Sequence, residues 1–237
     1  MVRWDPCQRQ CQCRGPAAPG PGRPGPARSG SPVSDPPAGA TEAGAPRLVV
    51  VRHGATAWSV AGRHTGRTDL PLLEEGRRQA HALGRRLRPG RFALVLTSPL
   101  ARARETCVLA GFGAVSETCE DLREWDYGAY EGRTTDEVRA ERPDWSLWRD
   151  GAPEGERAED VGRRVDRVIA AVRRAPGDVL AFAHAHVLRV LAARWVGLGP
   201  EGGAVLVLEP ATVSVLGWER EQPTLQRWND AAGDPLA

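Results

Sequence analysis

The sequence contains no lysine, so each of its 32 basic residues other than histidine is an arginine. Lysine forms Schiff bases with carbonyl substrates, grips phosphate in P-loop proteins and contacts ATP phosphates in protein kinases, so these three mechanisms are excluded. Any anion site must therefore be built from guanidinium groups, histidines or backbone amides.

Cysteine is also scarce, with five residues in 237. Cys7, Cys11 and Cys13 lie near the N-terminus with no fourth ligand nearby, and Cys107 and Cys119 lie in apolar surroundings. An odd number of cysteines in a reducing compartment favours free thiols over a disulfide framework or a metal site.

Neither a strong net charge nor a long apolar run is present. The formal net charge of +2 lacks the basic excess of a nucleic-acid-binding protein. No apolar stretch could span a bilayer, and polar residues interrupt the start of the chain where a signal peptide needs an apolar core. We therefore expect a cytoplasmic protein that binds neither membranes nor nucleic acids.

Proline and glycine divide the chain into three parts. Residues 1–45 are rich in both and have almost nothing to bury, which predicts a disordered tail. Residues 46–220 are long enough for one domain with a sizeable core. Residues 221–237 show no clear periodicity, and we expect an irregular C-terminal tail there.

Strands and helices alternate within the predicted domain. We expect strands at 47–52, 92–97, 114–118, 179–183, 204–208 and 213–219, and helices at 73–87, 99–110, 134–140, 157–174 and 185–196. The helix at 157–174 has the clearest pattern, because its apolar residues recur at helical spacing among charged ones. This alternation predicts an α/β fold, a three-layer α/β/α sandwich around a mostly parallel central sheet.

Arg52, His53 and Gly54 come directly after the apolar run of the first predicted strand. The glycine breaks the extended conformation, which places the two side chains at the carboxyl end of the strand, where open α/β sheets bind ligands. A neutral imidazole can attack phosphorus while a guanidinium holds the phosphate oxygens. The loops at 54–56 and 63–66 could add backbone amides and hydroxyls.

A second strand end carries Ser98, Pro99 and Arg102. Ser98 is expected to cap the following helix, and Pro99 suits its first turn. Arg102 in that turn would clamp an anion that the helix N-terminus already favours. Arg104 is expected on another face of the helix.

A third strand end carries His184 and His186. The carboxyl ends of parallel strands meet at one edge of the sheet, so these histidines could share a crevice with His53 and Arg102. The alternative is a metal held by His184 and His186. The arginines at the same edge would repel a cation, so we expect no metal.

Residues 122–132 combine acids, aromatics and glycines, as a structured loop would. A carboxyl partly shielded by an aromatic ring could serve as a general acid. Glu124, Asp126 and Glu131 all compete for that role, and periodicity does not choose among them.

At these motifs the chain resembles the histidine phosphatase superfamily, which includes cofactor-dependent phosphoglycerate mutases and many phosphatases. The resemblance covers about residues 47–218 and implies a phosphoglycerate mutase-like fold. It implies that His53 is a nucleophile that becomes transiently phosphorylated and that Glu124 is the proton donor. It further implies that Arg52, Arg102 and His184 bind the phosphate oxygens, and that no cofactor or metal is needed.

Several stretches look most similar to a branch with bacterial broad-specificity acid phosphatases and sedoheptulose-bisphosphatase-like enzymes. The residues that this resemblance implies as substrate-binding are Thr56, Ser59, Thr65, Gly66, Tyr127, Ala185 and His186. Two of them depart from the branch, because Ser59 replaces a frequent asparagine and Ala185 a frequent glycine. Packing at the start of a helix is an equally good hypothesis for His186.

The choice between mutase and phosphatase depends on the anchors that the mutases use for a second acidic group. Their lysine position falls near Thr135, and their arginine pair falls on Arg149 and Asp150. An aspartate facing an acidic substrate would repel it. We therefore expect a phosphoric monoester hydrolase for small phosphorylated metabolites such as sugar phosphates, with a homodimer as a possible assembly. The alternatives are a phosphoglycerate mutase and a non-catalytic phospholigand-binding module.

Overall fold

The computed structural model describes residues 45–88 and 90–231, and a six-stranded sheet lies at its centre. The strands run in the order β3-β2-β4-β1-β5-β6. Their bounds are Leu48–Arg52 for β1, Leu94–Thr97 for β2, Ser116–Thr118 for β3, Val179–Ala183 for β4, Val213–Glu219 for β5 and Gln222–Asp230 for β6. Strands β3, β2, β4 and β1 are parallel, whereas β5 pairs antiparallel with β1 and β6 with β5.

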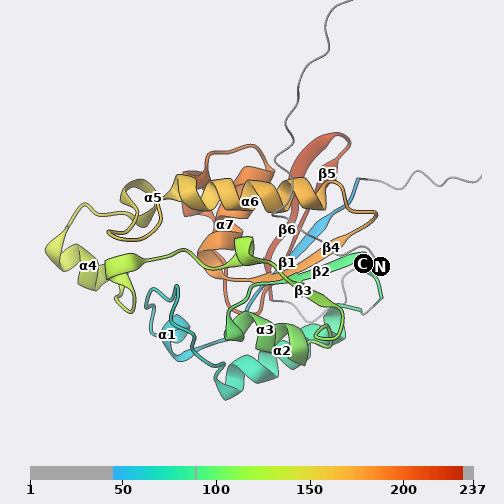
Figure 1. Cartoon of the computed structure of the whole chain (residues 1–237), viewed down its shortest axis with the longest axis horizontal. Helices are drawn as coiled ribbons and strands as arrows, with labels where there is room; N and C mark the ends of the chain where they lie inside the picture. Colours follow the sequence, from blue (N-terminus) through green and yellow to red (C-terminus); the bar gives the residue numbers. More distant parts are fainter. Residues whose placement is uncertain (1–44, 89, 232–237) are drawn as a thin grey trace, which may run out of the picture. The chain divides into compact units, whose positions relative to one another are not determined.

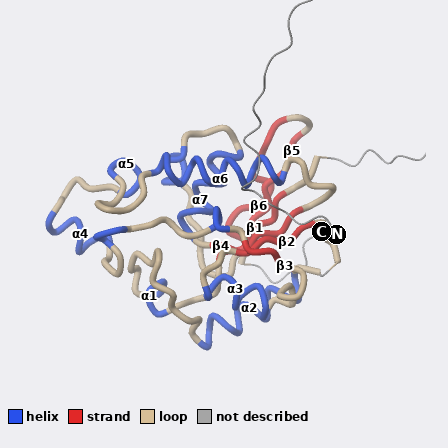
Figure 2. Tube along the Cα trace, viewed as in Figure 1, coloured by secondary structure: helices blue, strands red, loops and turns tan. Residues whose placement is uncertain are grey.

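Helices cover both faces of the sheet (Figures 1 and 2). Helices α2 (Glu74–Arg86) and α3 (Ala101–Leu109) lie on one face, and α6 (Ala158–Val172) and α7 (Ala185–Trp195) lie on the other. Parallel strands need crossover connections, and these helices provide them. The predicted α/β sandwich with a mostly parallel sheet is confirmed.

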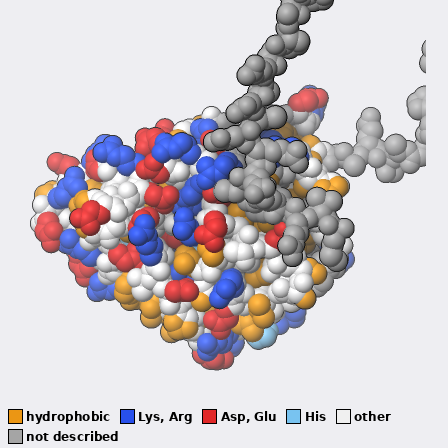
Figure 3. Space-filling view, viewed as in Figure 1, with side chains coloured by type: hydrophobic (Ala, Val, Ile, Leu, Met, Phe, Trp, Pro, Cys, Tyr) orange, Lys and Arg blue, Asp and Glu red, His pale blue; other side chains and the backbone are white. Residues whose placement is uncertain are grey.

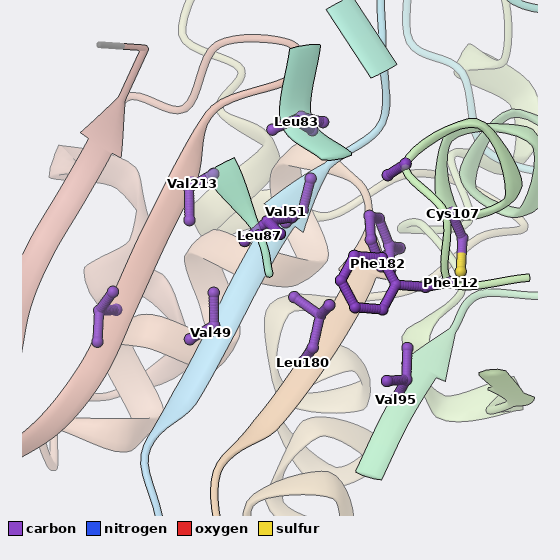
Figure 4. Packing of buried hydrophobic residues seen from close by; sticks show 12 residues of the cluster. Val49, Val51, Leu83, Leu87, Val95, Cys107, Phe112, Leu180, Phe182 and Val213 are labelled. Carbon is purple, nitrogen blue, oxygen red and sulfur yellow. The ribbon is translucent and has the colours of Figure 1, made fainter. Parts of the chain in front are cut away.

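The alternation of side chains along β1 divides the core between the two faces. Val49 and Val51 face α2 and α3, where they pack with Leu83, Phe112 and Phe182 (Figure 4). Each of these side chains is almost completely buried, and burying one of this size stabilises the fold by about 1.5–3 kcal/mol. The core therefore fixes the register of β1, and with it the position of the residues that follow.

Short helices and loops lie beyond the carboxyl ends of the parallel strands, toward the left of Figure 1. The helices labelled there are α1 (Ala57–Val60), α4 (Thr135–Glu141) and α5 (Leu147–Asp150). The connection between β3 and α4 also contains the 3-10 helices η1 (Glu120–Leu122) and η2 (Gly128–Tyr130). They are too short to build the core, and instead form walls around the end of the sheet.

Two expected elements are wrong. The strand expected at 204–208 is instead the end of the 3-10 helix η3 (Pro200–Val205) and a loop. Val205 and Val207 are 82% and 63% exposed, so this apolar run is not a buried strand. Proline at the first turn of η3 favours the helical start.

The irregular tail expected from residue 221 is also wrong, because Gln222–Asp230 forms the edge strand β6. No residue of β6 is fully buried, so an edge strand of this kind leaves little apolar alternation in the sequence. The folded domain therefore extends to Asp230. The tail predicted at the N-terminus and its three cysteines lie outside the described residues, except for the tail's last residue.

Cys107 and Cys119 are free and buried, and burial raises the pKa of their thiols to about 11 and about 12.

Arginines and acidic side chains alternate over the face shown in Figure 3, without a large region of one sign. Over residues 45–88 and 90–231, no helix is both long enough and apolar enough to cross a membrane.

Candidate active site

The end of β1 is held against the end of β4 by a backbone hydrogen bond. The amide of His53 donates to the carbonyl of Ala183 at 3.0 Å. Gly54 then passes α2 so closely that a Cβ would lie 2.4 Å from the carbonyl oxygen of Gly76. Only glycine fits there, and this close passage directs the chain away from the sheet immediately after His53.

The hydrogen bonding of His53 leaves one ring nitrogen available as a nucleophile. Nδ1 lies 2.7 Å from the carbonyl oxygen of Gly54, and a carbonyl can only accept, so Nδ1 carries the proton. The lone pair is therefore on Nε2. Burial, reinforced by the charges of Arg52 and Arg102, holds the pKa of His53 well below its usual value and keeps the ring neutral.

A cavity of about 320 Å³ opens beside His53. Eight of the twelve residues predicted for the site line it: Arg52, His53, Ser59, Thr65, Glu124, Tyr127, Ala185 and His186. Arg52 donates to the carbonyl of Leu208, and its buried Nε has no hydrogen-bond partner among the described residues. Burial lowers the pKa of Arg52 from its usual value, but a guanidinium remains charged. The cavity therefore combines a neutral imidazole with a fixed positive charge.

Arg102 is fully buried and does not line the cavity. Its guanidinium donates to the carbonyls of Thr65, Gly66 and Thr68 at 2.8–3.0 Å, and its Nε donates to His184. Most of its donors are thus occupied by the protein. The direct clamp on an anion therefore stays a prediction; in this structure Arg102 holds the loop 65–68, and its positive charge acts on His53.

His184 is the second member of this buried arrangement. Its Nδ1 accepts from Arg102 at 3.1 Å, so Nε2 carries the proton and donates to Ser98 Oγ at 2.7 Å. Its ring lies 5.1 Å from that of His53. Because both nitrogens are occupied, this geometry does not suit a metal shared with His186. The expectation that Ser98 caps helix α3 is wrong, since α3 begins at Ala101 without a side-chain cap.

Of the three carboxylates that competed for an acid role, only Glu124 lines the cavity. Its oxygens accept from the amides of Trp125, His186 and Val187 at 2.9–3.0 Å. Two of these amides belong to the first turn of α7, whose own N-cap, His184, makes no side-chain cap. Glu124 therefore supplies the missing cap.

The other two carboxylates are used elsewhere. Asp126 accepts from the amide of Gly128 and pairs with Arg67. Glu131 accepts from the amides of Gly66 and Thr68. Both contacts shape loops rather than the cavity.

Four of the predicted substrate-binding residues have structural hydrogen bonds. Thr56 is fully buried and forms a capping box at α1 with Ser59. Thr65 donates its hydroxyl to the carbonyl of Arg63, and Gly66 donates its amide to Glu131. Ser59 and Thr65 still line the cavity, whereas Thr56 and Gly66 do not.

The backbone amides of the loop 54–56 are also occupied, contrary to expectation. The amide of Gly54 donates to the Thr106 hydroxyl, that of Ala55 to Gln79 and that of Thr56 to Ser59. The amides of this loop are therefore all used within the protein.

Several cavity residues were not predicted. They include Thr135, Arg139, Trp145, Trp148 and Arg189. Arg189 lies on α7 three residues after His186, so helical spacing could have indicated it. Its guanidinium stacks on the Trp148 ring at 4.5 Å. The others come from α4, α5 and their flanking loops, and no sequence pattern connects them to His53.

The expected repulsion by Asp150 is wrong. Neither Arg149 nor Asp150 lines the cavity, because Asp150 accepts from the amide of Ser146 and pairs with Arg149. Thr135, at the position of the mutase lysine, does line it. The case against a mutase therefore depends on the absence of the mutases' own lysine and arginine pair rather than on a repelling acid.

The buried histidines predict acid sensitivity of the fold. Burial lowers the pKa of His64 to about 4, below its value of 6.5 in the unfolded chain, so the unfolded state binds more protons as pH falls through this interval. We expect His64 to reduce the free energy of unfolding by about 2 kcal/mol between pH 7 and pH 5. Urea titrations at pH 7 and pH 5 measure the free energy of unfolding of wild type and His64→Gln. The difference between the two proteins should be smaller at pH 5 by that amount.

His81 offers a matched control for this measurement. It is the exposed member of the chain's five histidines, on α2. The difference in unfolding free energy between His81→Gln and wild type should be the same at pH 7 and at pH 5. If the difference between His64→Gln and wild type were also the same at both pH values, the prediction would be contradicted.

Comparison with known proteins identifies the family. A model of the histidine phosphatase superfamily (branch 1) matches residues 48–231. The chain belongs to the histidine phosphatase superfamily. The family identified from the sequence and its class, a phosphoric monoester hydrolase, are thereby confirmed.

Similar proteins include phosphatases from two organisms. An acid phosphatase of Mycobacterium tuberculosis is 40% identical over 179 residues, which cover 73% of this chain and 87% of that protein. A sedoheptulose 1,7-bisphosphatase of Saccharomyces cerevisiae is 38% identical over 187 residues, covering 65% and 69%. A solved structure of an open reading frame product of M. tuberculosis has a TM-score of 0.75 at 38% identity, covering 79% of this chain and 98% of that one.

Proposed function

We propose that the protein hydrolyses small phosphomonoesters, sugar phosphates among them, through a phosphohistidine intermediate on His53, with Glu124 as the proton donor. The observation that carries this proposal is the tautomer of His53. Its Nδ1 proton is bound to the Gly54 carbonyl, and its pKa is lowered, so Nε2 presents a lone pair beside the cavity. A nucleophile needs that lone pair at neutral pH.

In the first step, His53 Nε2 attacks phosphorus in line with the ester oxygen. The P–N bond forms, the P–O bond breaks and the leaving oxygen takes a proton from Glu124. Arg52, which lines the same cavity, stabilises the charge on the phosphoryl oxygens. Arg102 contributes positive charge from behind the ring without needing to touch the phosphate.

In the second step, water attacks the phosphohistidine. It gives a proton to the Glu124 carboxylate as it bonds to phosphorus, and the P–N bond breaks to release phosphate. Both groups then return to their starting states. His184 acts as a positioning residue in this scheme, because its two nitrogens are bound to Arg102 and Ser98.

The lining of the cavity supports a polyhydroxylated leaving group. The rings of His64, Tyr127 and Trp148 supply apolar faces, and Thr135 and Ser146 supply neutral polar ones. Such mixed surfaces suit a sugar better than a long acyl chain. The name of the yeast relative, a sedoheptulose 1,7-bisphosphatase, supports the same class.

A phosphate-release screen tests this proposal. It should compare sugar mono- and bisphosphates with p-nitrophenyl phosphate, and assay conversion of 3-phosphoglycerate with 2,3-bisphosphoglycerate in parallel. We expect phosphate release to exceed isomerisation. Faster isomerisation would indicate a mutase, and phosphate binding without turnover would indicate a binding module.

Glu124→Gln is expected to change how rate depends on the leaving group. Poor leaving groups need a proton, whereas nitrophenolate does not, so kcat/KM for alkyl phosphates should fall at least about tenfold more than for p-nitrophenyl phosphate. The measurement is a plot of log kcat/KM against leaving-group pKa for a series of esters, and Glu124→Gln should give a steeper slope than the wild type.

Asp126→Asn is the control, because Asp126 neighbours Glu124 in the chain but does not line the cavity. Its slope should equal that of the wild type. Equal losses on all esters in Glu124→Gln would remove Glu124 from the acid role and leave it as the cap of α7.

A further inference from the structure

Tyr127 and His186 form a hydrogen bond whose direction can be assigned. The Tyr127 hydroxyl oxygen lies 2.7 Å from His186 Nδ1. Tyr127 is 2% exposed, and this is its hydroxyl's one hydrogen bond among the described residues. A buried hydroxyl is costly unless its proton is donated, so Tyr127 donates and Nδ1 accepts.

This direction fixes the tautomer of His186. Burial holds the pKa of His186 well below its usual value, so the ring is neutral and carries one proton. Since Nδ1 accepts, that proton is on Nε2. The structure therefore turns a group with two possible tautomers into a donor of known position.

The donor belongs to the same cavity as the acid. His186 lines the cavity, its side chain is 21% exposed, and Nε2 makes no hydrogen bond within the described part of the chain. The backbone amide of His186 donates to Glu124, and its Nδ1 lies 4.0 Å from Glu124 Oε2. A group held by Nε2 would therefore lie in the same cavity as the ester oxygen that Glu124 protonates.

We propose that Tyr127 is a positioning residue that fixes the proton on His186 Nε2, and that this N–H binds a hydroxyl of the leaving group close to the ester oxygen. The inference rests on the proposed phosphatase function and deepens it. The His186 Nε2–H group would favour hydroxylated leaving groups, such as sugars, over aryl groups without such a hydroxyl.

The surroundings of Tyr127 keep the donor in place. Its ring stacks on His64 at 4.8 Å and 18°, and the His186 ring lies 5.3 Å from Trp148. Each ring is therefore packed against an aromatic neighbour. A donor held this firmly loses little entropy when it binds a substrate hydroxyl.

Tyr127→Phe tests the inference with a closely matched control. It removes one oxygen and keeps the ring, so His186 can adopt either tautomer. We expect the ratio of kcat/KM for the best sugar phosphate of the panel to that for phenyl phosphate to fall roughly three- to tenfold. Tyr130, the chain's other tyrosine, bonds to Arg142 and does not line the cavity, so Tyr130→Phe should leave this ratio unchanged.

A double-mutant cycle shows whether Tyr127 acts through His186. His186→Ala should lower the same ratio, and adding Tyr127→Phe to it should have no further effect. Independent, multiplying losses would overturn the positioning role. An unchanged ratio in both single variants would overturn the inference while leaving the phosphatase proposal intact.

Nitrogen-15 NMR of the histidine rings gives a readout that needs no turnover. In the wild type, His186 should show a protonated Nε2 and an unprotonated Nδ1, and His186→Gln assigns its signals. Tyr127→Phe should shift them toward a mixture of tautomers. A wild-type spectrum with the proton on Nδ1 would overturn the assignment. Failure of the proposed function would instead show as absent phosphate release with this spectrum intact.

Discussion

Replacing His53 with alanine is expected to lower kcat/KM for every phosphomonoester by roughly 10⁴-fold or more, because the proposed nucleophile that forms the covalent intermediate is lost. A second measurement is direct. Rapid quenching of the wild type with a phosphorus-32-labelled substrate should trap an acid-labile, alkali-stable phosphoenzyme, as expected of a P–N bond. His53→Ala should trap none.

The fold should survive this substitution. Among the described residues, His53 makes one side-chain hydrogen bond, to its neighbour Gly54, so its loss should cost about 1–3 kcal/mol of unfolding free energy. His81→Ala provides an exposed control that should keep full activity and label normally. Turnover at the wild-type rate in a folded His53→Ala protein would refute the nucleophile.

Arg102→Ala is expected to have the largest effect on stability. Its guanidinium is 0% exposed and satisfies the carbonyls of Thr65, Gly66 and Thr68. Removing it leaves these carbonyls, all of them at least partly buried, without their donor, at a cost of about 3–5 kcal/mol. For a domain of this size the melting temperature should fall by roughly 6–20 °C, measured by calorimetry.

Arg104→Ala separates this effect from a general loss of charge on α3. Arg104 is exposed two residues along the same helix, and its removal should change stability by less than about 0.5 kcal/mol. A small, equal change in both variants would show that the hydrogen bonds of Arg102 contribute little. It would return Arg102 to the role of a phosphate clamp.

The strand ends were predictable because local signals and topology agree there. An apolar β-branched run followed by glycine places His53 at the end of β1, and the rule that parallel strands bind ligands at their carboxyl ends brings Ser98 and His184 beside it. The resemblance then chose Glu124 among three carboxylates. The contacts that distinguish Glu124, to the amides of α7, join residues more than sixty positions apart and leave no local trace.

The roles of individual donors were not predictable from the sequence. Arg102 was expected to hold an anion, but its hydrogen bonds depend on where the loop 65–68 passes. The far wall of the cavity shows the same limit, because Trp145 and Trp148 reach it only through the packing of α4 and α5. Strand β6 was not predicted for a simpler reason: an edge strand buries too few side chains to require alternating apolar residues in the sequence.

The carboxylate at the first turn of α7 has a further consequence in the proposed cycle. An ionised acid accepts hydrogen bonds more strongly than a neutral one, so each proton that Glu124 releases tightens its hold on the amides of His186 and Val187, and each proton it regains loosens that hold. The hydrogen bonds that hold the start of α7 would then strengthen and weaken once in each catalytic cycle. An acid of different length at this position would disturb both together.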